Sequence, residues 1–449
     1  MSENSLGLRK RVFKAGSITL IAFGSGQILR LLTNLAVSRL VSPSDFGLMA
    51  LATAILVILN LFSDIGLRQC IVRSPNGNDP RMLNTAWTLQ VIRGGVLFLV
   101  CCVVGLCLGT LVTPEIGVGA SVYAHPELPY VIAALGITSL ILGFNTARTH
   151  IAQRRLELKR PAIVELGSLV MTIFVTLVLA YRNPTVWSFV GGSIAGAFAQ
   201  VTLNWMLMPG PSDRFLLDPD ALREILGFGR WILFSSMVFV LVSNGDRLIL
   251  GYWFSPSILG LYSIALALAT LPELVVGRLL NSVALPALSE VFRSDPIRLS
   301  AVYYKIRFPV DIFLLGLSGF LFAASQNLID LMYDPRYAGA GSLLQILSIS
   351  AIFARHSLDG CLYMAYGKPQ FMSWVHLLKL ASMLILVPLG YYFGSLYGAV
   401  LAVAIINLPT LPFIYWVNAR MGVLAWRREI QTVPAWLFGF FLGVIVISL

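Results

Sequence analysis

Long apolar segments, each about the length that crosses a bilayer as a helix, constrain the fold of this chain more than any other feature. Backbone polar groups in hydrocarbon must be bonded within the segment, which favours helices. Strands of a membrane barrel would alternate apolar and polar residues, and these segments do not. Only 12% of the residues are charged, against about a quarter in soluble domains. The sequence therefore predicts an all-α polytopic membrane protein.

The apolar segments predict six transmembrane helices in each half of the chain and a further one at its C-terminal end. In the first half they lie near residues 15–40, 46–65, 85–109, 128–147, 161–181 and 185–208. In the second half they lie near residues 229–250, 256–278, 304–325, 342–363, 370–392 and 395–417, and the last begins near residue 433. Each half thus has an even number of spans and begins on the same side of the membrane.

A repeated heptapeptide relates the two halves. The sequence SPSDFGL at 42–48 returns as SPSILGL at 255–261, and the same shift carries Gly16 onto Gly229. Two halves that begin on the same side are parallel repeats, and secondary transporters place a solute path between repeats. We therefore predict two parallel-repeat six-helix bundles around a central cavity, with lobes at 1–210 and 211–420 and an additional transmembrane helix in 421–449. Ser-Pro is also ordinary turn chemistry, which is the alternative explanation.

Basic residues predict the orientation of the chain in the membrane. Arg and Lys at positions 9–14 precede the first span, and Arg68 and Arg81 follow the second. Since short cytoplasmic loops collect Lys and Arg, we expect a cytoplasmic N-terminus. The net charge of +11 then reports topology and contact with anionic lipid headgroups rather than nucleic-acid binding.

Several motifs of enzymes and ATP-driven pumps are missing from the sequence. It contains no GxxxxGK[ST] phosphate loop and no Gly-x-Ser-x-Gly elbow. Its five cysteines show no CxxC spacing, and its four histidines are scattered without the spacing of metal ligands. We expect no direct use of ATP, no metal, no cofactor and no enzymatic activity.

Ionisable residues inside the apolar segments are the candidate functional residues. They are Arg30, Arg39, Arg93, Asp246, Arg247, Asp311, Arg355, Asp359 and Lys379. Burying one such charge in a bilayer costs roughly 2.5 to 3.5 kcal/mol, so several must face a partner or a watery cavity. Because cations exceed anions and arginine grips phosphate or carboxylate with two donors, the pattern indicates a cationic cavity for an anionic solute. Arg30 and Arg93 are the strongest candidates for solute contact, whereas Arg39 lies near a span end, where it can reach the interface.

The first span carries a polar stripe around Arg30. Gln27 and Asn34 lie seven residues apart with Arg30 between them, so all three share one helix face. Such a stripe is poor chemistry for a lipid-facing surface. We expect it to line the cavity, and packing against another helix is the alternative.

Ionisable residues of the second half leave more alternatives open. Arg355 and Asp359 are four apart and can neutralise each other or contact a ligand. Asp246 and Arg247 point about 100° apart on a helix and cannot pair directly, which favours roles in the cavity or between the lobes. Asp311 and Lys379 form a possible pair for coupling to a cation or proton, and Asp246 is a further candidate for coupling.

Several segments resemble a known family. The stretches 38–73, 84–87 and 89–94 resemble the polysaccharide transporter branch of the multidrug/oligosaccharidyl-lipid/polysaccharide exporter superfamily. The segment GDRLILG at 245–251 and residues 259–263 are similar to the matching part of those proteins. The likeness extends over essentially the whole chain and points to Wzx-type oligosaccharide flippases.

The resemblance implies a flippase in a bacterial inner membrane. Such a protein moves undecaprenyl-diphosphate-linked oligosaccharide repeat units from the cytoplasmic to the periplasmic leaflet, for exopolysaccharide or lipopolysaccharide biosynthesis, by alternating access. Arg30, Arg93, Arg247 and Arg355 would contact headgroup or glycan, with membrane lipids, a polysaccharide polymerase and assembly proteins as partners. The alternatives are a lipid II flippase, a drug/cation antiporter of the same superfamily, or a membrane glycan polymerase.

Overall fold

The computed structural model describes residues 3–74, 76–111, 121–154, 157–210 and 212–448, and within these ranges it contains helices and no strand. Among these residues, nine helical segments are long and apolar enough to cross a membrane, or ten if the bent pair Leu128–Gly143 and Arg148–Arg154 crosses as one. The prediction of an all-α, multi-pass membrane protein is confirmed. Two compact units divide the chain, Met1–Ser257 and Ile258–Leu449.

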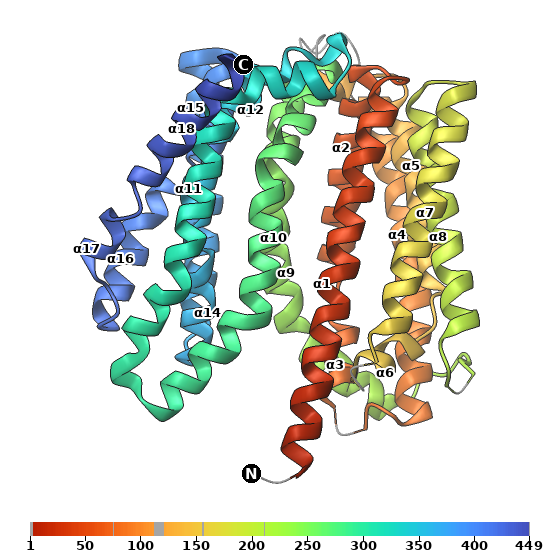
Figure 1. Ribbon diagram of the computed structural model, residues 1–449. Helices are drawn as coiled ribbons and strands as arrows, with labels where there is room; N and C mark the ends of the chain where they lie inside the picture. Colours follow the sequence, from red (N-terminus) through yellow and green to blue (C-terminus); the bar gives the residue numbers. More distant parts are fainter. Residues whose placement is uncertain (1–2, 75, 112–120, 155–156, 211, 449) are drawn as a thin grey trace. The chain divides into compact units, whose positions relative to one another are not determined.

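Unit 1 is a bundle of long helices (Figure 1). Its helices are α1 (Glu3–Ser38), α2 (Pro43–Phe62), α3 (Leu67–Arg73), α4 (Pro80–Leu111), α5 (Leu128–Gly143), α6 (Arg148–Arg154), α7 (Lys159–Arg182), α8 (Val186–Leu207) and α9 (Pro219–Trp253), with the short 3-10 turn η1 (Val122–Ala124) before α5. The closest pairs are α4 with α5 and α7 with α8, and α2 packs against α9.

The repeated heptapeptide begins a helix in both of its copies. Ser42 caps α2, its hydroxyl oxygen accepting a hydrogen bond from the Asp45 amide at 3.3 Å, and Pro43 occupies the first turn. In the second copy, Ser255 precedes α10, which begins at Pro256. Proline fits the first helical position because the N–H it lacks would have no partner there. Both copies therefore have the same local structure.

Two adjacent glycines on α4 show how closely this helix packs against α5. A Cβ added at Gly94 would lie 2.7 Å from the Ser139 carbonyl oxygen and 2.9 Å from the Gly143 Cα on α5, whereas one added at Gly95 would meet nothing within 4 Å. Gly94 thus allows the two backbones to approach, as small residues do in membrane helix pairs.

We expect Gly94→Ala to lower the free energy of unfolding by about 1–3 kcal/mol, because a methyl group added at this tight contact forces the backbones of α4 and α5 apart. The matched Gly95→Ala should be neutral or stabilise by about 0.5–1 kcal/mol, since alanine is the better helix former. Chemical denaturation of the two purified variants in the same micelles measures the difference. Equal stabilities would contradict the tight α4–α5 approach.

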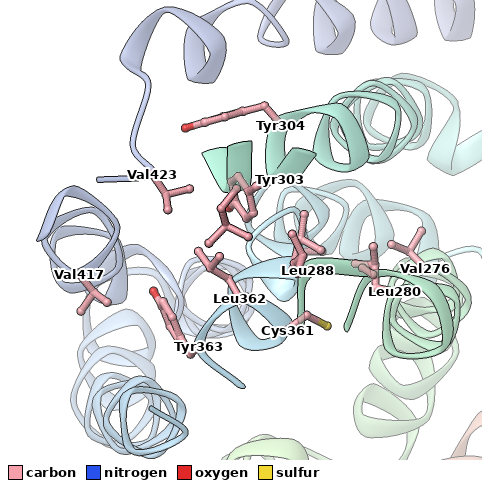
Figure 2. Close-up of a cluster of buried hydrophobic side chains, with 14 of the residues drawn as sticks. Val276, Leu280, Leu288, Tyr303, Tyr304, Cys361, Leu362, Tyr363, Val417 and Val423 are labelled. Atoms are coloured by element: carbon pink, nitrogen blue, oxygen red, sulfur yellow. The ribbon is translucent and has the colours of Figure 1, made fainter. Parts of the chain in front are cut away.

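Unit 2 contains the remaining helices (Figure 1). They are α10 (Pro256–Ser294), α11 (Leu299–Met332), α12 (Ala340–Leu347), α13 (Ser350–Ala354), α14 (Ser357–Ala365), α15 (Gln370–Ala404), α16 (Leu411–Arg420), α17 (Trp426–Ile430) and α18 (Pro434–Ser448), with 3-10 turns η2 (Pro296–Arg298), η3 (Pro335–Tyr337) and η4 (Leu408–Thr410). Figure 2 shows its apolar core, in which Tyr303 of α11 lies among side chains that include Leu362 of α14 and Val423.

The terminal helix α18 packs along α11 over most of its length. The contact uses glycines on both helices, because a Cβ added at Gly439 would collide with the Gly316 carbonyl and one at Gly319 with the Trp436 carbonyl. The predicted additional helix near residue 433 is therefore present as α18 and is joined to unit 2 by backbone approach.

Three predicted spans differ in detail from the structure. The segment 342–363 is three short helices, α12 to α14, rather than one. The segments 370–392 and 395–417 meet in α15, where Gly394 and Ser395 are non-helical and Ser395 has φ 48°. That kink coincides with the predicted boundary between the two spans, and the chain leaves the helical path again before α16.

The predicted lobes stay a prediction. Their boundary between residues 210 and 211 falls at a position outside the described residues, whereas the packing units divide at Ser257. Helix α9, the first of the second predicted repeat, packs with unit 1 through α2, α3 and α4. A sequence repeat and a packing unit need not share a boundary, and the predicted central cavity likewise stays a prediction.

Candidate functional site

The polar stripe of α1 lies on a long, apolar and weakly buried helix. Gln27 and Asn34 are half-buried, and Arg30 is exposed. Within the described part of the chain, the Arg30 guanidinium forms no hydrogen bond or ion pair. The stripe therefore presents an unneutralised cation within an apolar segment.

Arg93 of α4 has protein partners. Its Nε donates to the Ser63 hydroxyl at 2.9 Å, and its Nη2 donates to the Asn60 carbonyl at 2.6 Å. Both acceptors lie at the C-terminal end of α2, where carbonyls lack helical partners and a cation is favoured. Arg93 thus caps α2 in this structure, and a role in solute contact stays a prediction.

Asp246 and Arg247 lie on α9 and do not pair with each other, as their spacing indicates. Asp246 is buried, and Arg247 is half-buried with its Nη1 donating to the Asn244 amide oxygen at 3.2 Å. The Arg247 Nε is buried and has no hydrogen-bond partner within the described ranges. The predicted roles of these two residues are not tested by these contacts.

Unit 2 holds a buried ionic cluster of Arg307, Asp311, Arg355 and Glu429, each at most 6% exposed. Arg307 grips Glu429 with two parallel hydrogen bonds, Nη1 to Oε1 at 2.7 Å and Nη2 to Oε2 at 2.8 Å. Asp311 Oδ2 lies 3.3 Å from Arg307 Nε and 3.5 Å from Arg355 Nε. Arg355 Nη2 also donates to Glu429 Oε2. Two cations and two anions thus alternate, as burial of charge requires.

A second carboxylate network adjoins the ionic cluster. Asp359 accepts a hydrogen bond from the Tyr303 hydroxyl at 2.5 Å and from the Asn418 amide at 3.0 Å, and it lies 2.9 Å from His356 Nδ1. The Tyr303 hydroxyl in turn accepts from Arg307 Nη1 at 2.7 Å. Tyrosine and arginine therefore link Asp359 to Glu429 in one continuous polar network inside the core.

These contacts show which partners the ionisable residues of unit 2 have, while their predicted roles stay predictions. Arg355 and Asp359 do not neutralise each other, because Arg355 lies at the break between α13 and α14 and is turned to Asp311 and Glu429. Asp311 pairs with arginines and, among the described residues, forms no ion pair with Lys379, which is half-buried. The predicted coupling role of Asp311 and Lys379 stays a prediction.

Sequence reasoning missed Arg307 and Glu429. Arg307 lies near a predicted span end, where basic residues are assigned to the cytoplasmic face, and Glu429 belongs to no predicted span. Arg307 and Asp311 are, however, four residues apart on one helix, the spacing of an ion pair. That spacing was the available signal, and no local pattern points to Glu429, since it comes from 122 residues further along the chain.

Comparisons with known proteins agree with the membrane fold and indicate its family. A family model described as polysaccharide biosynthesis protein matches residues 36–341, more than half of the chain. Among curated proteins, the lipopolysaccharide biosynthesis protein WzxC of Escherichia coli (strain K12) is 20% identical over 448 residues, which cover 95% of this chain and 86% of WzxC. The succinoglycan biosynthesis transport protein ExoT of Rhizobium meliloti (strain 1021) is 20% identical over 394 residues, covering 87% and 77% respectively.

A solved structure shares the fold. The lipid II flippase MurJ, in an inward closed conformation, superposes with a TM-score of 0.73 at 12% sequence identity and covers 95% of this chain and 92% of its own. At that identity the likeness shows the fold alone. It agrees with the predicted all-α membrane fold.

Proposed function

This chain belongs to the polysaccharide biosynthesis protein family, and on that premise we propose that it is a flippase for lipid-linked oligosaccharides. Its cargo is an undecaprenyl-diphosphate-linked repeat unit that is transferred from the cytoplasmic to the periplasmic leaflet by alternating access. The product supplies exopolysaccharide or lipopolysaccharide biosynthesis. The names of its relatives WzxC and ExoT, which refer to lipopolysaccharide biosynthesis and succinoglycan transport, support this cargo class.

The single observation that carries the proposal is the free guanidinium of Arg30 on an apolar helix. A charge in such a segment costs roughly 2.5 to 3.5 kcal/mol unless it meets a counter-charge or water. Among the described residues Arg30 has no counter-charge, and a diphosphate supplies one. Arginine binds phosphate oxygens with two donors at once. Gln27 and Asn34 on the same face add hydrogen-bonding groups suited to a glycan, while the polyprenyl chain stays in lipid.

The location follows from the same proposal. The protein resides in a bacterial inner membrane with its N-terminus in the cytoplasm, where the lipid-linked precursor is made. Basic residues that precede the first span and follow the second support this orientation. A polysaccharide polymerase on the opposite side would consume the product and is the expected functional partner.

Transbilayer movement in vesicles tests the proposal. The purified chain is reconstituted into liposomes that contain a fluorescent undecaprenyl-diphosphate oligosaccharide, and the fraction accessible to an external, impermeant quencher is followed over time. We expect the accessible fraction to rise from about half toward all of the probe only in vesicles that contain the protein, because spontaneous transfer of a charged headgroup is opposed by its desolvation. No difference from empty vesicles would refute a flippase.

Two parallel assays separate the rival functions. Fluorescent lipid II in place of the oligosaccharide lipid would move faster if the cargo were a peptidoglycan precursor. Uptake of a fluorescent organic cation would indicate a drug antiporter, which needs accessible carboxylates. In unit 2, Asp311 and Glu429 are paired with arginine, which favours an anionic cargo over a cationic one.

A further inference from the structure

Helix α17 buries one charged side chain in unit 2 and makes two contacts to aromatic rings at its surface. Trp426 lies against Tyr415 with ring centroids 5.1 Å apart, and the Arg428 guanidinium lies 5.4 Å from the Tyr304 ring centroid. Of its five residues, Trp426 to Ile430, only Glu429 is buried. Trp426 and Ile430 are 58% and 65% exposed, and both arginines between them are exposed as well. Burial of apolar surface is what usually fixes a helix on a core, and α17 buries little of it, so among the described residues of α17 the Glu429 side chain is its buried anchor.

The connections on either side of α17 are mostly polar. Ala425 donates its amide to the Tyr304 hydroxyl at 3.0 Å, and the Thr432 hydroxyl lies 3.4 Å from Asp311 Oδ2. The apolar anchor is Val423, which is buried in the core shown in Figure 2. Gly422 beside it has a positive φ of 68°, a conformation that ends α16 and sets the chain direction. Withdrawal of α17 would therefore break the contact of Trp426 with Tyr415 but expose little further apolar surface.

One of the two arginines beneath α17, Arg355, is not fully satisfied by the described residues. Arg355 is 6% exposed, yet among the described residues its Nε has no hydrogen-bond partner, although Asp311 Oδ2 lies 3.5 Å from it. Nearby, the Asn418 Oδ1 and the Tyr363 hydroxyl are buried without partners too. Unpartnered buried polar atoms are rare in folded proteins and indicate a place for water or a ligand. An anion with more oxygens than one carboxylate would satisfy the free Arg355 donor.

We propose that Arg307 and Arg355 form a phosphoryl-anion site in which Glu429 is a resident substitute anion, displaced when α17 withdraws and a diphosphate binds. The proposal rests on the proposed function and assigns to this site the headgroup of its cargo. Carboxylate and phosphate present similar paired oxygens to a guanidinium, so one can replace the other. A buried ion pair contributes little net stability beyond its desolvation, which keeps the exchange close to balance.

Neutralising Glu429 tests the site directly. The purified full-length chain in nanodiscs is titrated with inorganic pyrophosphate, and binding is measured by calorimetry. In Glu429→Gln the Kd for pyrophosphate should be about tenfold lower than in the unmodified chain, because the competing charge is gone while its volume remains. The matched control is Glu290→Gln, the same change at an exposed position of α10, which should leave the Kd unchanged.

Two further variants keep the test decisive. Glu429→Gln combined with Arg355→Gln should lose the gain, because half of the cationic site is removed. If Glu429→Gln does not fold, Glu429→Asp retains the charge on a shorter side chain, and an intermediate gain is expected. Pyrophosphate binding that is the same in Glu429→Gln, Glu290→Gln and the unmodified chain would overturn the proposal and leave the cluster a structural ion-pair network.

The source of the phosphoryl group is decided by a second ligand. A short prenyl diphosphate that competes with pyrophosphate, and binds more tightly in the lipid nanodisc, would identify the lipid headgroup. Pyrophosphate that binds alone, without competition, would identify free phosphate and contradict the cargo assignment. Because these are binding measurements, they can fail while transbilayer movement in vesicles succeeds, which separates this site from the proposed function.

Discussion

Replacing Arg307 with alanine is expected to lower the free energy of unfolding by about 3–5 kcal/mol, the range observed when one partner of a buried ion pair is removed. Arg307 is fully buried and is the only residue that donates to Tyr303, Asp311 and Glu429 together, among those the structure describes. Its loss leaves two buried carboxylates with only Arg355 between them. Thermal unfolding of the purified variant in lipid-containing micelles should show a large fall in Tm.

Arg298→Ala is the matched control for Arg307→Ala. Arg298 is also an arginine near the start of α11, with an ion pair to Asp295 at 3.1 Å, but its side chain is 78% exposed. Exposed pairs contribute about 0–1 kcal/mol, so its removal should hardly change the Tm. A similar loss for both variants would mean that general charge at this end of α11, rather than the buried cluster, stabilises unit 2.

A double variant isolates the ion pair itself. Arg307→Met combined with Glu429→Leu replaces the ion pair by apolar side chains, and Asp311 remains paired with Arg355. Replacement of a whole buried pair is often neutral or stabilising, so most of the stability lost in Arg307→Ala should return. A double variant as unstable as the single one would show that Arg307 acts through Tyr303 and Asp311 instead of Glu429.

The fold was predictable from the sequence where a physical signal is local. Apolar length fixed the membrane helices, since only helices satisfy their backbone within one segment. The Ser-Pro motif marked the start of α2 and of α10 through capping chemistry that acts within one turn. The kink at Gly394 and Ser395 fell at a predicted boundary because a glycine there lowers helical preference.

The candidate site was less predictable because its partners are distant in sequence. The sequence identified Asp311 and Arg355 as costly intramembrane charges. It did not indicate that they belong to one ionic cluster with Arg307 and Glu429. The break of 342–363 into α12 to α14, which turns Arg355 toward Asp311, has no strong breaker in its sequence. The sequence also identified Arg93 as an intramembrane charge. Its hydrogen bonds to the end of α2 depend on how α4 packs against α2, which the periodicity of a single segment does not reveal.

Replacing Arg30 with alanine is expected to reduce transbilayer movement of the lipid-linked oligosaccharide about tenfold or more while leaving the protein folded. An arginine that holds a charged group contributes on the order of 1.5–3 kcal/mol through its hydrogen bonds, which corresponds to such a factor. Arg30 is exposed and has no hydrogen bond or ion pair among the described residues, so its removal breaks neither kind of interaction there. The initial rate in reconstituted vesicles and the Tm of the same preparation measure both effects.

Arg93→Ala distinguishes a cation that binds cargo from one that holds the fold. Arg93 gives two hydrogen bonds to the end of α2, so its loss should lower the free energy of unfolding by about 1–3 kcal/mol. If Arg93 also contacts the headgroup, transbilayer movement by the folded Arg93→Ala protein stops; normal movement would remove Arg93 from the set of cargo contacts.

Arg30→Lys completes the comparison with Arg30→Ala, because it keeps the charge but not the two-donor fork, and it should recover only part of the rate. Full activity of Arg30→Ala at unchanged Tm would remove the observation on which the flippase mechanism rests, since the free cation would then have no role in transport.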